Sequence, residues 1–427
     1  MNIIRYPDKT LWPTIVERPH IDRTKLSTTV SNILAEVKSD GDKALFKYEE
    51  IFDKVKLQSV AVTPEEMEEA DSLISKELKD AMRIAYNNIF TFHESQRFQG
   101  EKIVTQPGVT CWQKQVPIER VGLYVPGGSA PLFSTVLMLA VPAKIAKCDK
   151  IVLCTPPGKN GKIAPSVLVA AKMVGVNSVF KVGGVQAIGA MAYGTESIPC
   201  VYKIFGPGNQ YVTEAKQQVS QTGVAIDMPA GPSEVCIIAD KYANATFVAS
   251  DLLSQAEHGP DSQCLLITTS EHLLEEVQNN IAKQLETLPR KEIASKALHT
   301  SKLILVKNDD DAMELSNLYA PEHLIIQTRN YEVLADKVIN AGSVFLGNFS
   351  CESAGDYASG TNHTLPTNGY AKAYSGVNLD SYFRKITFQH LDENGIKSIG
   401  HAVELMADAE FLTAHKRAMS LRLEGIK

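Results

Sequence analysis

Short runs of β-branched and aliphatic residues alternate with helical patterns between about residues 121 and 347, and this alternation constrains the fold most strongly. The expected strands of a first series are VGLYV, KIVLC, VFKVG, KIFG and VAIDM, and those of a second series are EVCIIA, QCLLITT, KLILV, HLIIQT and SVFLG. Helices are expected around 134–147, 166–174, 187–193 and 210–220. Such alternation predicts βαβ units, with mostly parallel sheets covered by helices. The two series therefore predict an α/β fold with two Rossmann-like halves that meet near PAGPS, residues 229–233.

The segments that flank the two series have a different texture. The first 110 residues favour helices, with amphipathic stretches at 29–51 and 64–90, and the last 35 residues favour a helical tail. Residues 350–376 are rich in Gly, Ser, Thr and Asn and are too many for a simple connection. Long polar loops inside compact domains are usually functional or disordered. The Asp, the His and the aromatic residues of this loop favour a function.

Bulk properties exclude several classes of protein. The chain has 427 residues, 44% hydrophobic and 22% charged, which fits two or three globular domains. A net charge of -6 without a basic block argues against a nucleic-acid or membrane partner. The first residues, MNIIRYPDKT, do not resemble a signal peptide, and the most apolar window, 132–145, is too short to span a bilayer. Because the seven cysteines contain no C-x-x-C pair, we expect a reduced, cytoplasmic protein without a disulfide framework.

The common cofactor and nucleophile motifs do not occur in the sequence. There is no G-x-G-x-x-G, P-loop, G-x-S-x-G or H-E-x-x-H, and the nearest glycine-rich segments are PGG (126–128), VGGVQAIG and FGPGNQY. Glycine turns of this kind are also what any α/β protein needs for tight strand-to-helix connections. The pattern alone therefore does not establish dinucleotide binding.

The segment FVASDLLSQAEHGPDSQ carries a candidate metal site. Gln255 and His258 are three residues apart near the end of an expected helix, so both side chains could reach one metal ion. The alternative is that His258 only caps the carboxyl end of this helix. Asp356, in the polar loop, is a possible carboxylate ligand or an Asx-turn residue. His415 falls at helical spacing from Phe411, Leu412 and Met419, where packing alone would explain it.

A second candidate lies in APEHLIIQT. Pro321 breaks the preceding helix, and Glu322 and His323 stand just before a buried strand. An adjacent carboxylate and imidazole suit general acid/base chemistry, although an ordinary polar turn would look the same. The cysteines are weak candidates for a nucleophile, because none lies beside a His or at an evident helix start. Singly, these signals do not identify an enzyme.

Seven segments, taken in order along the chain, resemble the histidinol dehydrogenase family. They are ERVGLYVPGGSAPLFSTVLMLAVPAKIAKC, VGGVQAIGAMAYGTESIP, KIFGPGN, IDMPAGPSEV, DLLSQAEHGPDSQ, APEHL and GDYASGTNHTLPT. Several are long and specific, and together they extend over nearly the whole chain. The resemblance implies a zinc-dependent enzyme that oxidises L-histidinol through its aldehyde to L-histidine with two NAD molecules, at the end of histidine biosynthesis.

The resemblance also implies the residues of the site. One zinc ion per subunit would be bound by Gln255, His258, Asp356 and His415. The family forms a domain-swapped homodimer with shared active sites, in which the last histidine comes from the tail of the other subunit. Glu322 and His323 match the catalytic acid/base pair. The positions that match substrate contacts are Ser233, Gln255, His258, His323, Asp356, Glu410 and His415, and those that match cofactor contacts are Tyr124, Gln186 and Asn209.

These roles give an expected division of the chain and an expected mechanism. Residues 1–20 would be an N-terminal segment, 21–123 with 234–377 the metal- and substrate-binding α/β domain, 124–233 the Rossmann-like NAD-binding domain, and 378–427 a dimerisation tail. His323 would take the hydroxyl proton, and Glu322 would help water add to the aldehyde. Two alternatives stay open from the residues themselves: a zinc hydrolase that uses Glu322 to activate water, and a binding module without catalytic activity.

Overall fold

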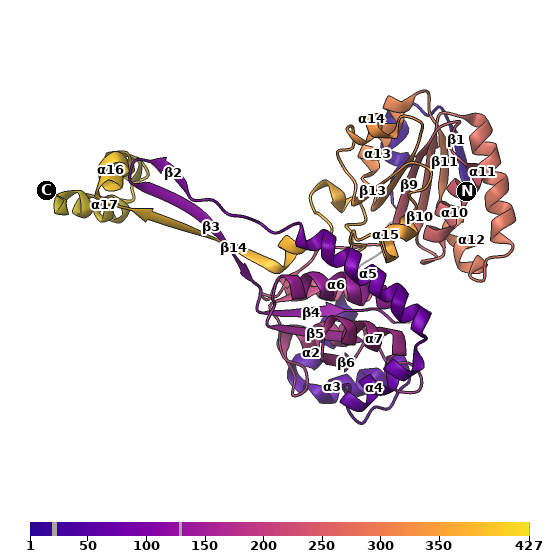
Figure 1. Cartoon of the computed structure of the whole chain (residues 1–427), viewed down its shortest axis with the longest axis horizontal. Helices are drawn as coiled ribbons and strands as arrows, with labels where there is room; N and C mark the ends of the chain where they lie inside the picture. Colours follow the sequence, from indigo (N-terminus) through magenta and orange to yellow (C-terminus); the bar gives the residue numbers. More distant parts are fainter. Residues whose placement is uncertain (19–23, 128–129, 427) are drawn as a thin grey trace.

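The computed structural model describes residues 1–18, 24–127 and 130–426, and it places two α/β halves beside each other with an arm that projects from them (Figure 1). The first half contains a parallel five-stranded sheet in the order β6-β5-β4-β7-β8. Its strands are β4 (Arg120–Tyr124), β5 (Lys150–Thr155), β6 (Ser178–Lys181), β7 (Lys203–Phe205) and β8 (Ala225–Ile226). The connecting helices are α6 (Phe133–Ile145), α7 (Pro165–Val174), α8 (Gly184–Tyr193) and α9 (Gln210–Ser220). The strand order reverses between β4 and β7, and open α/β sheets bind ligands at the carboxyl ends of such a pair.

The helices that precede this sheet pack against it. They are α2 (Thr24–Asp40), α3 (Asp42–Tyr48), the π-helical turn η2 (Glu49–Asp53), α4 (Pro64–Leu73) and α5 (Lys76–Glu94). Met82 and Ile89 of α5 join one apolar core with α6 and α7, and Leu34 of α2 joins another with α8 and α9. The packing thus groups residues 24–94 with the first sheet, whereas the sequence division grouped 21–123 with the second half. An amphipathic pattern reveals that a helix is covered, but not which sheet covers it. The functional roles of the two domains stay a prediction.

The second half contains a parallel six-stranded sheet in the order β1-β11-β10-β9-β12-β13. Its strands are β1 (Asn2–Arg5), β9 (Glu234–Ala239), β10 (Gln263–Thr268), β11 (Lys302–Leu305), β12 (His323–Gln327) and β13 (Ser343–Leu346). Its helices are α10 (Ala245–Ala256), α11 (Glu271–Leu285), α12 (Lys291–Thr300), α13 (Asp309–Tyr319) and α14 (Tyr331–Ala335); η1 (Lys9–Leu11) and α1 (Trp12–Ile15) follow β1. Strands β9, β10 and β12 are buried along their whole length, as continuous apolar runs in a covered parallel sheet require. The predicted α/β fold with two Rossmann-like halves is confirmed.

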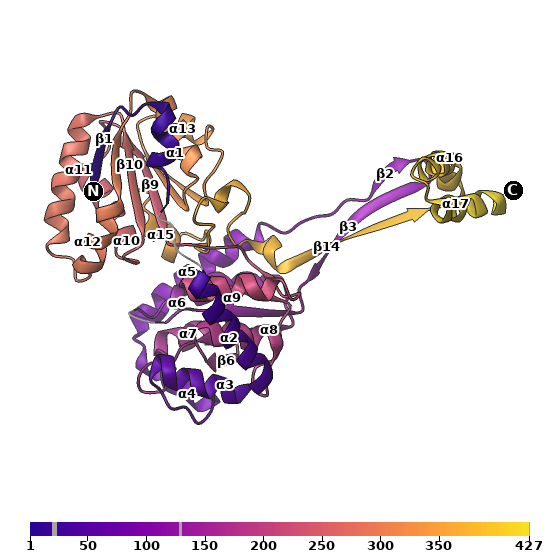
Figure 2. The same cartoon turned by 180° about the vertical axis from the view of Figure 1, so that it is seen from behind.

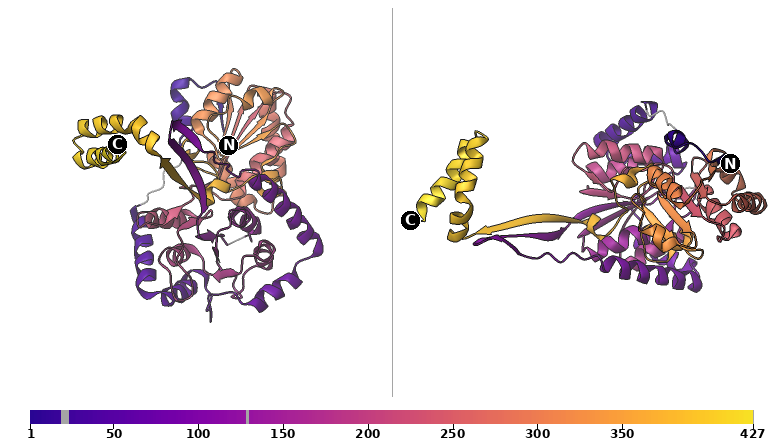
Figure 3. Two further views of the ribbon diagram at one scale, coloured as in Figure 1. Left: turned by 60° about the vertical axis from the view of Figure 1, so that its left-hand side comes forward. Right: turned by 90° about the horizontal axis from the view of Figure 1, so that it is seen from above.

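An antiparallel sheet forms the projecting arm, which Figure 2 shows from behind and Figure 3 from above. It consists of β2 (Ile103–Gln106), β3 (Val109–Pro117) and β14 (Phe383–Leu391) in the order β14-β3-β2, and it leads to α16 (Glu393–Ala409) and α17 (Thr413–Gly425). The helical tail is confirmed, with a break at residues 410–412. The first 110 residues are mostly helical, as expected, apart from β1, the start of β3 and, between them, β2. This strand is exposed at all four positions, so no alternation of apolar and polar residues marks it.

The polar segment 350–376 is ordered and joins the two halves. It contains α15 (Glu352–Tyr357) and η3 (Tyr370–Lys372), and η4 (Leu379–Tyr382) follows it. A ring nitrogen of His363 lies 3.1 Å from the Thr135 hydroxyl, and the other lies 2.9 Å from the carbonyl oxygen of Asp356. Thr135 is in the first turn of α6, which follows the carboxyl end of β4. These contacts therefore turn the carboxyl edge of the first sheet toward the helix that carries Asp356.

In the described ranges, no helix is both long enough and apolar enough to cross a membrane.

Candidate metal centre and active site

His323 is the first residue of β12 and lies at the amino edge of the second sheet, beside the start of β9. The α13 helix ends at Tyr319, and Ala320, with φ 52°, turns the chain into Pro321 and the strand. The His323 side chain is buried, and its Nδ1 atom lies 3.1 Å from the carbonyl oxygen of Glu234. Since a carbonyl oxygen can only accept, Nδ1 carries the hydrogen and Nε2 keeps its lone pair. Nε2 has no hydrogen-bond partner among the described residues and lies 3.6 Å from Asp356 Oδ1. In the neutral form of the ring, Nε2 is therefore available as a base.

Glu322 lies beside this imidazole and is also buried. One carboxylate oxygen, Oε2, accepts a hydrogen bond of 2.9 Å from the backbone N–H of Glu234 and lies 3.7 Å from His323 Nδ1. Burial raises the pKa of Glu322 to about 7. A carboxyl group with such a pKa can both accept and return a proton near neutral pH.

Three donor atoms for a metal ion converge next to these two residues. Ligand atoms of His258, Glu352 and Asp356 all lie within 4.8 Å of one another. His258 follows the end of α10, whereas Glu352 and Asp356 lie four residues apart on α15. Gln255, in the last turn of α10, is fully buried, and neither of its side-chain amide atoms has a hydrogen-bond partner within the described ranges. Nitrogen and oxygen donors of this kind suit zinc, so the residues fit such an ion. The sequence had placed Asp356 on a loop, and this was wrong because ESAGDY folds as a helix.

Glu352 is the residue that the sequence reasoning missed. Its side chain is 1% exposed, its Oε1 atom lies 3.9 Å from His323 Nδ1, and its Oε2 atom lacks a partner among the described residues. Burial raises the pKa of Glu352 to about 8. The four-residue spacing between Glu352 and Asp356 was visible in the sequence and places both on one face of a helix. The Gly and Ser content of the segment concealed that helix.

The electrostatic balance of the site depends on its carboxylates. Burial alone would lower the pKa of His323, but the facing carboxylates of Glu352 and Glu322 raise it well above its usual range. Burial opposes ionisation of Asp356, yet its contact with His323 holds the pKa of that carboxyl below its usual value. The site thus concentrates negative charge around one imidazole, which favours a cation.

A buried hydrogen-bonded pair, Asp251 and Gln327, lies near the metal donors. Asp251 lies one helical turn before Gln255 on α10, and its Oδ2 accepts a hydrogen bond of 2.7 Å from Gln327 on β12. Burial raises the pKa of Asp251 to about 7. This bond ties the end of α10 to the strand that carries His323.

Of the remaining predicted site residues, Ser233 lies near the metal donors, whereas Glu410 and His415 lie far from them in one chain. Ser233 directly precedes β9, so it borders the site at the amino edge of the second sheet. Glu410 and His415 are exposed and belong to the tail at the end of the arm, away from α10 and α15 (Figure 1). The apolar helix face expected around His415 forms only in part, because Phe411 and Leu412 lie in the turn before α17 and only Met419 shares that helix with His415. One chain therefore does not bring His415 to the other predicted ligands.

The three predicted cofactor contacts lie at the switch point of the first sheet. Tyr124 ends β4, and its hydroxyl accepts a hydrogen bond of 3.1 Å from the N–H of Gly184 at the start of α8. Asn209 follows β7 and caps α9 through hydrogen bonds from the N–H groups of residues 211 and 212. Gln186, in the first turn of α8, donates to Glu49 over 2.9 Å. Gln186 is fully buried, and its Oε1 atom has no partner within the described ranges. The arrangement fits a dinucleotide, because helix amino ends converge on the sheet edge where nucleotides bind.

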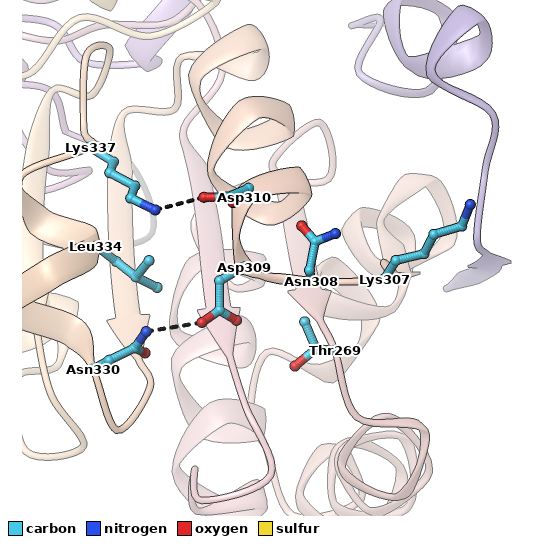
Figure 4. A pocket seen from close by; sticks show the side chains of 8 residues that line it. All are labelled: Thr269, Lys307, Asn308, Asp309, Asp310, Asn330, Leu334 and Lys337. Carbon is cyan, nitrogen blue, oxygen red and sulfur yellow. Dashed lines mark hydrogen bonds and ion pairs between the residues drawn. The ribbon is translucent and has the colours of Figure 1, made fainter.

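A separate pocket of about 440 Å³ lies at the carboxyl edge of the second sheet (Figure 4). Asp309 and Asp310, in the first turn of α13, line this pocket. Asp309 accepts a hydrogen bond of 3.0 Å from Asn330, and Asp310 accepts one of 2.6 Å from Lys337. Two carboxylates at a helix amino end repel phosphate. The strand-edge rule that fits the first sheet therefore does not locate a nucleotide site in the second.

Comparisons with known proteins agree with this geometry. The family model described as histidinol dehydrogenase matches residues 16–423. The chain belongs to this family. A histidinol dehydrogenase of Bacteroides thetaiotaomicron is 64% identical over the full length of both chains, and one of Bacteroides fragilis is 62% identical over the same extent. A crystal structure of histidinol dehydrogenase from Elizabethkingia anophelis has a TM-score of 0.98 and 53% identity, and the match covers 100% of this chain and 98% of that one.

The match to the solved histidinol dehydrogenase includes the arm, because it covers the whole of this chain. The arm is therefore a shared element of this fold and not a feature of one sequence. The cysteines contribute little to the site of this family member. Cys148, Cys154, Cys236 and Cys264 are buried, and burial raises the pKa of Cys148 and Cys236 to about 12. A thiol with such a pKa is not a nucleophile at neutral pH.

Proposed function

We infer that the chain is a histidinol dehydrogenase, an NAD-dependent oxidoreductase that carries out the last steps of histidine biosynthesis. The observation that carries this proposal is the full-length similarity to curated histidinol dehydrogenases, at 64% identity over 427 residues. The finer proposal is that L-histidinol is oxidised through its aldehyde to L-histidine, with two NAD molecules and one zinc ion per subunit. The reaction takes place where the amino edge of the second sheet faces the carboxyl edge of the first.

The proposed zinc ligands are Gln255, His258, Asp356 and His415 of the partner subunit. The convergence of the His258 and Asp356 donor atoms supports this set. Gln255 supports it because buried amide groups normally form hydrogen bonds, and an amide oxygen without a partner is suited to a metal ion. Because His415 is exposed on the projecting arm, it could reach the metal site of a second chain, and this supports the proposal that each site receives its His415 from the partner subunit.

The exposed surface of the chain supports a homodimer with shared active sites. The chain exposes 21024 Å², whereas a compact protein of 46.7 kDa exposes roughly 16,000 Å². The surplus of roughly 5,000 Å² is large enough for a permanent interface. The arm and its tail contribute apolar side chains to this surface, among them Ile386, Leu405, Met406 and Phe411, which is 92% exposed. A second copy of the chain would cover them.

His323 and Glu322 are proposed as the catalytic pair. When bound, zinc polarises the substrate hydroxyl and offsets the charge of the surrounding carboxylates, and NAD accepts the hydride of each oxidation. His323 accepts the hydroxyl proton at Nε2, while its Nδ1–H bond to the Glu234 carbonyl fixes the orientation of the ring. Glu322 takes a proton from the water that adds to the aldehyde, which gives the hydrate for the second oxidation. Neither step needs a thiol.

The remaining predicted contacts complete the proposal. Tyr124, Gln186 and Asn209 would hold NAD at the switch point between β4 and β7. Ser233, beside the site, and Glu410, from the partner's tail, would position the substrate together with His323 and the metal ligands. Because the seven cysteines form no disulfide within the described residues, we also propose that the protein is cytoplasmic.

The test is the stoichiometry of the reaction with purified, metal-analysed protein. Complete turnover of one L-histidinol is expected to yield two NADH and one L-histidine, and a zinc chelator is expected to abolish the activity until zinc is restored. A yield of one NADH with free histidinaldehyde would refute the two-step proposal. Full activity in protein shown to be free of metal would refute the zinc proposal.

A further inference from the structure

Glu352 occupies a position that the family ligand set leaves without a role. Its donor atom lies within 4.8 Å of those of His258 and Asp356. It follows Cys351 at the start of α15, and its side chain is 1% exposed. One carboxylate oxygen, Oε2, has no hydrogen-bond partner within the described ranges. A carboxylate that is buried in this way is costly unless a cation or a hydrogen-bond donor satisfies it.

Of the described groups around Glu352, His323 is the one that can carry a positive charge, and it does not satisfy Oε2. Its ion-pair contact is with His323, whose Nδ1 atom lies 3.9 Å from Oε1 and is already directed at the Glu234 carbonyl. No Lys or Arg of the described residues forms an ion pair with Glu352. The neighbouring carboxylates of Asp356 and Glu322 add further negative charge. A divalent ion between His258, Glu352 and Asp356 would satisfy all of these groups together.

One chain therefore assembles three convergent donors without the tail. His415 is the ligand that one chain does not bring to the site, and Glu352 stands in a position to take its place. The neighbouring amide of Gln255, which also lacks a partner, adds a fourth possible donor. A set of three or four donors with nitrogen and oxygen atoms is sufficient to hold zinc.

We propose that Glu352 is a ligand of the metal in the substrate-free protein, with His258 and Asp356, and that it holds the metal in a chain whose site lacks His415. The inference rests on the proposed zinc function. It gives each chain its own metal site, so metal binding does not depend on the partner subunit. The ligand class is a divalent transition-metal ion such as Zn²⁺ or Co²⁺.

The first experiment measures metal binding to the full-length protein without substrate. Zinc affinity is determined by competition with a chromophoric chelator, and the coordination of Co²⁺ by its visible absorption spectrum. Glu352→Gln preserves the volume of the side chain and is expected to weaken zinc binding by more than about 100-fold, beyond the 10- to 100-fold typical of a residue behind the ligands. It is also expected to change the Co²⁺ spectrum. Asp251→Asn is the matched control, because it removes another buried carboxylate of the same region and should leave the spectrum unchanged.

The second experiment removes the tail ligand. His415→Asn is expected to retain stoichiometric zinc, whereas His415→Asn combined with Glu352→Gln is expected to lose it. Circular dichroism and sedimentation establish that each variant is folded and assembled before metal is added. A Glu352→Gln protein with an unchanged Co²⁺ spectrum, or a double variant that keeps its zinc, would overturn the proposal while leaving the zinc enzyme intact. A wild-type protein that binds neither metal would overturn the zinc function itself.

Discussion

The buried carboxyl group of Asp251 is expected to make the stability of the second half depend on pH. Its pKa rises from 3.8 to about 7 on folding, because burial disfavours the charged form more than the Gln327 hydrogen bond favours it. The folded protein therefore keeps a proton that the unfolded chain releases above pH 3.8. Below pH 3.8 this group does not reduce the free energy of unfolding. Above pH 3.8 the free energy of unfolding falls as the pH rises, and the reduction reaches its full size above about pH 7.

The size of the effect follows from the shift in pKa. One pKa unit corresponds to about 1.4 kcal/mol, so the full shift corresponds to about 4 kcal/mol. Of this, about 3 kcal/mol develops between pH 5 and pH 8. Asp251→Asn removes the ionisation, and the carbonyl oxygen of Asn can still accept the hydrogen bond from Gln327. We therefore expect the free energy of unfolding of the variant, relative to that of wild type, to increase by about 3 kcal/mol between pH 5 and pH 8.

Differential scanning calorimetry of the metal-free protein at pH 5 and pH 8 tests this prediction. For a unit of 150 to 250 residues, about 3 kcal/mol corresponds to a rise of roughly 6–12 °C in the Tm difference between variant and wild type. Asp80→Asn is the control, since Asp80 is exposed on α5 and meets water in both states. A difference between Asp251→Asn and wild type that is equal at both pH values would refute the reasoning.

Three further predictions concern catalysis. Inactive His415→Asn and inactive His258→Asn proteins, mixed under conditions of subunit exchange, should regain about half the normal activity per heterodimer if the sites are shared, and confirmed heterodimers without activity would exclude sharing. Glu322→Gln should impair oxidation of added histidinaldehyde more than the first hydride transfer, whereas His323→Asn should slow both by roughly 10²–10⁴-fold; equal effects on both half-reactions would contradict these roles. Glu49→Ala removes the carboxylate that accepts a hydrogen bond from Gln186, a predicted cofactor contact, and should raise the KM for NAD about tenfold with little change in kcat. Glu49→Gln should return the KM most of the way to the wild-type value, and an unchanged KM in the alanine variant would exclude this positioning role.

The sequence was most informative where one physical signal dominated. All ten expected strands of the two halves form. The buried ones among them, such as β9, β10 and β12, are continuous apolar runs because they are covered on both faces. The relation of Glu322 and His323 to β12 was also foreseen, since Pro321 marks the end of the helix before it. Local patterns sufficed for these features.

Other features depended on interactions that a local pattern does not contain. Strand β2 is exposed on both faces in one chain, so its residues carry no signal of a sheet. Glu352 was missed because α15 contains Gly and Ser and is held by its surroundings more than by its own helix propensity. The ligand set itself came from resemblance to a family, because His415 is more than fifty residues away from Asp356 and lies on the arm.

Strand β1 links the order of synthesis to the integrity of the second sheet. Residues Asn2–Arg5 pair with Lys302–Leu305, so at 5–20 residues per second β1 is made roughly 15–60 s before the strand that it pairs with. During that interval residues 24–94 and 120–226, which form most of the first half, can fold. In the finished protein β1 covers β11, whose Ile304 and Leu305 are fully buried. Removal of the first five residues would expose that apolar strand as a new sheet edge, a template for aggregation.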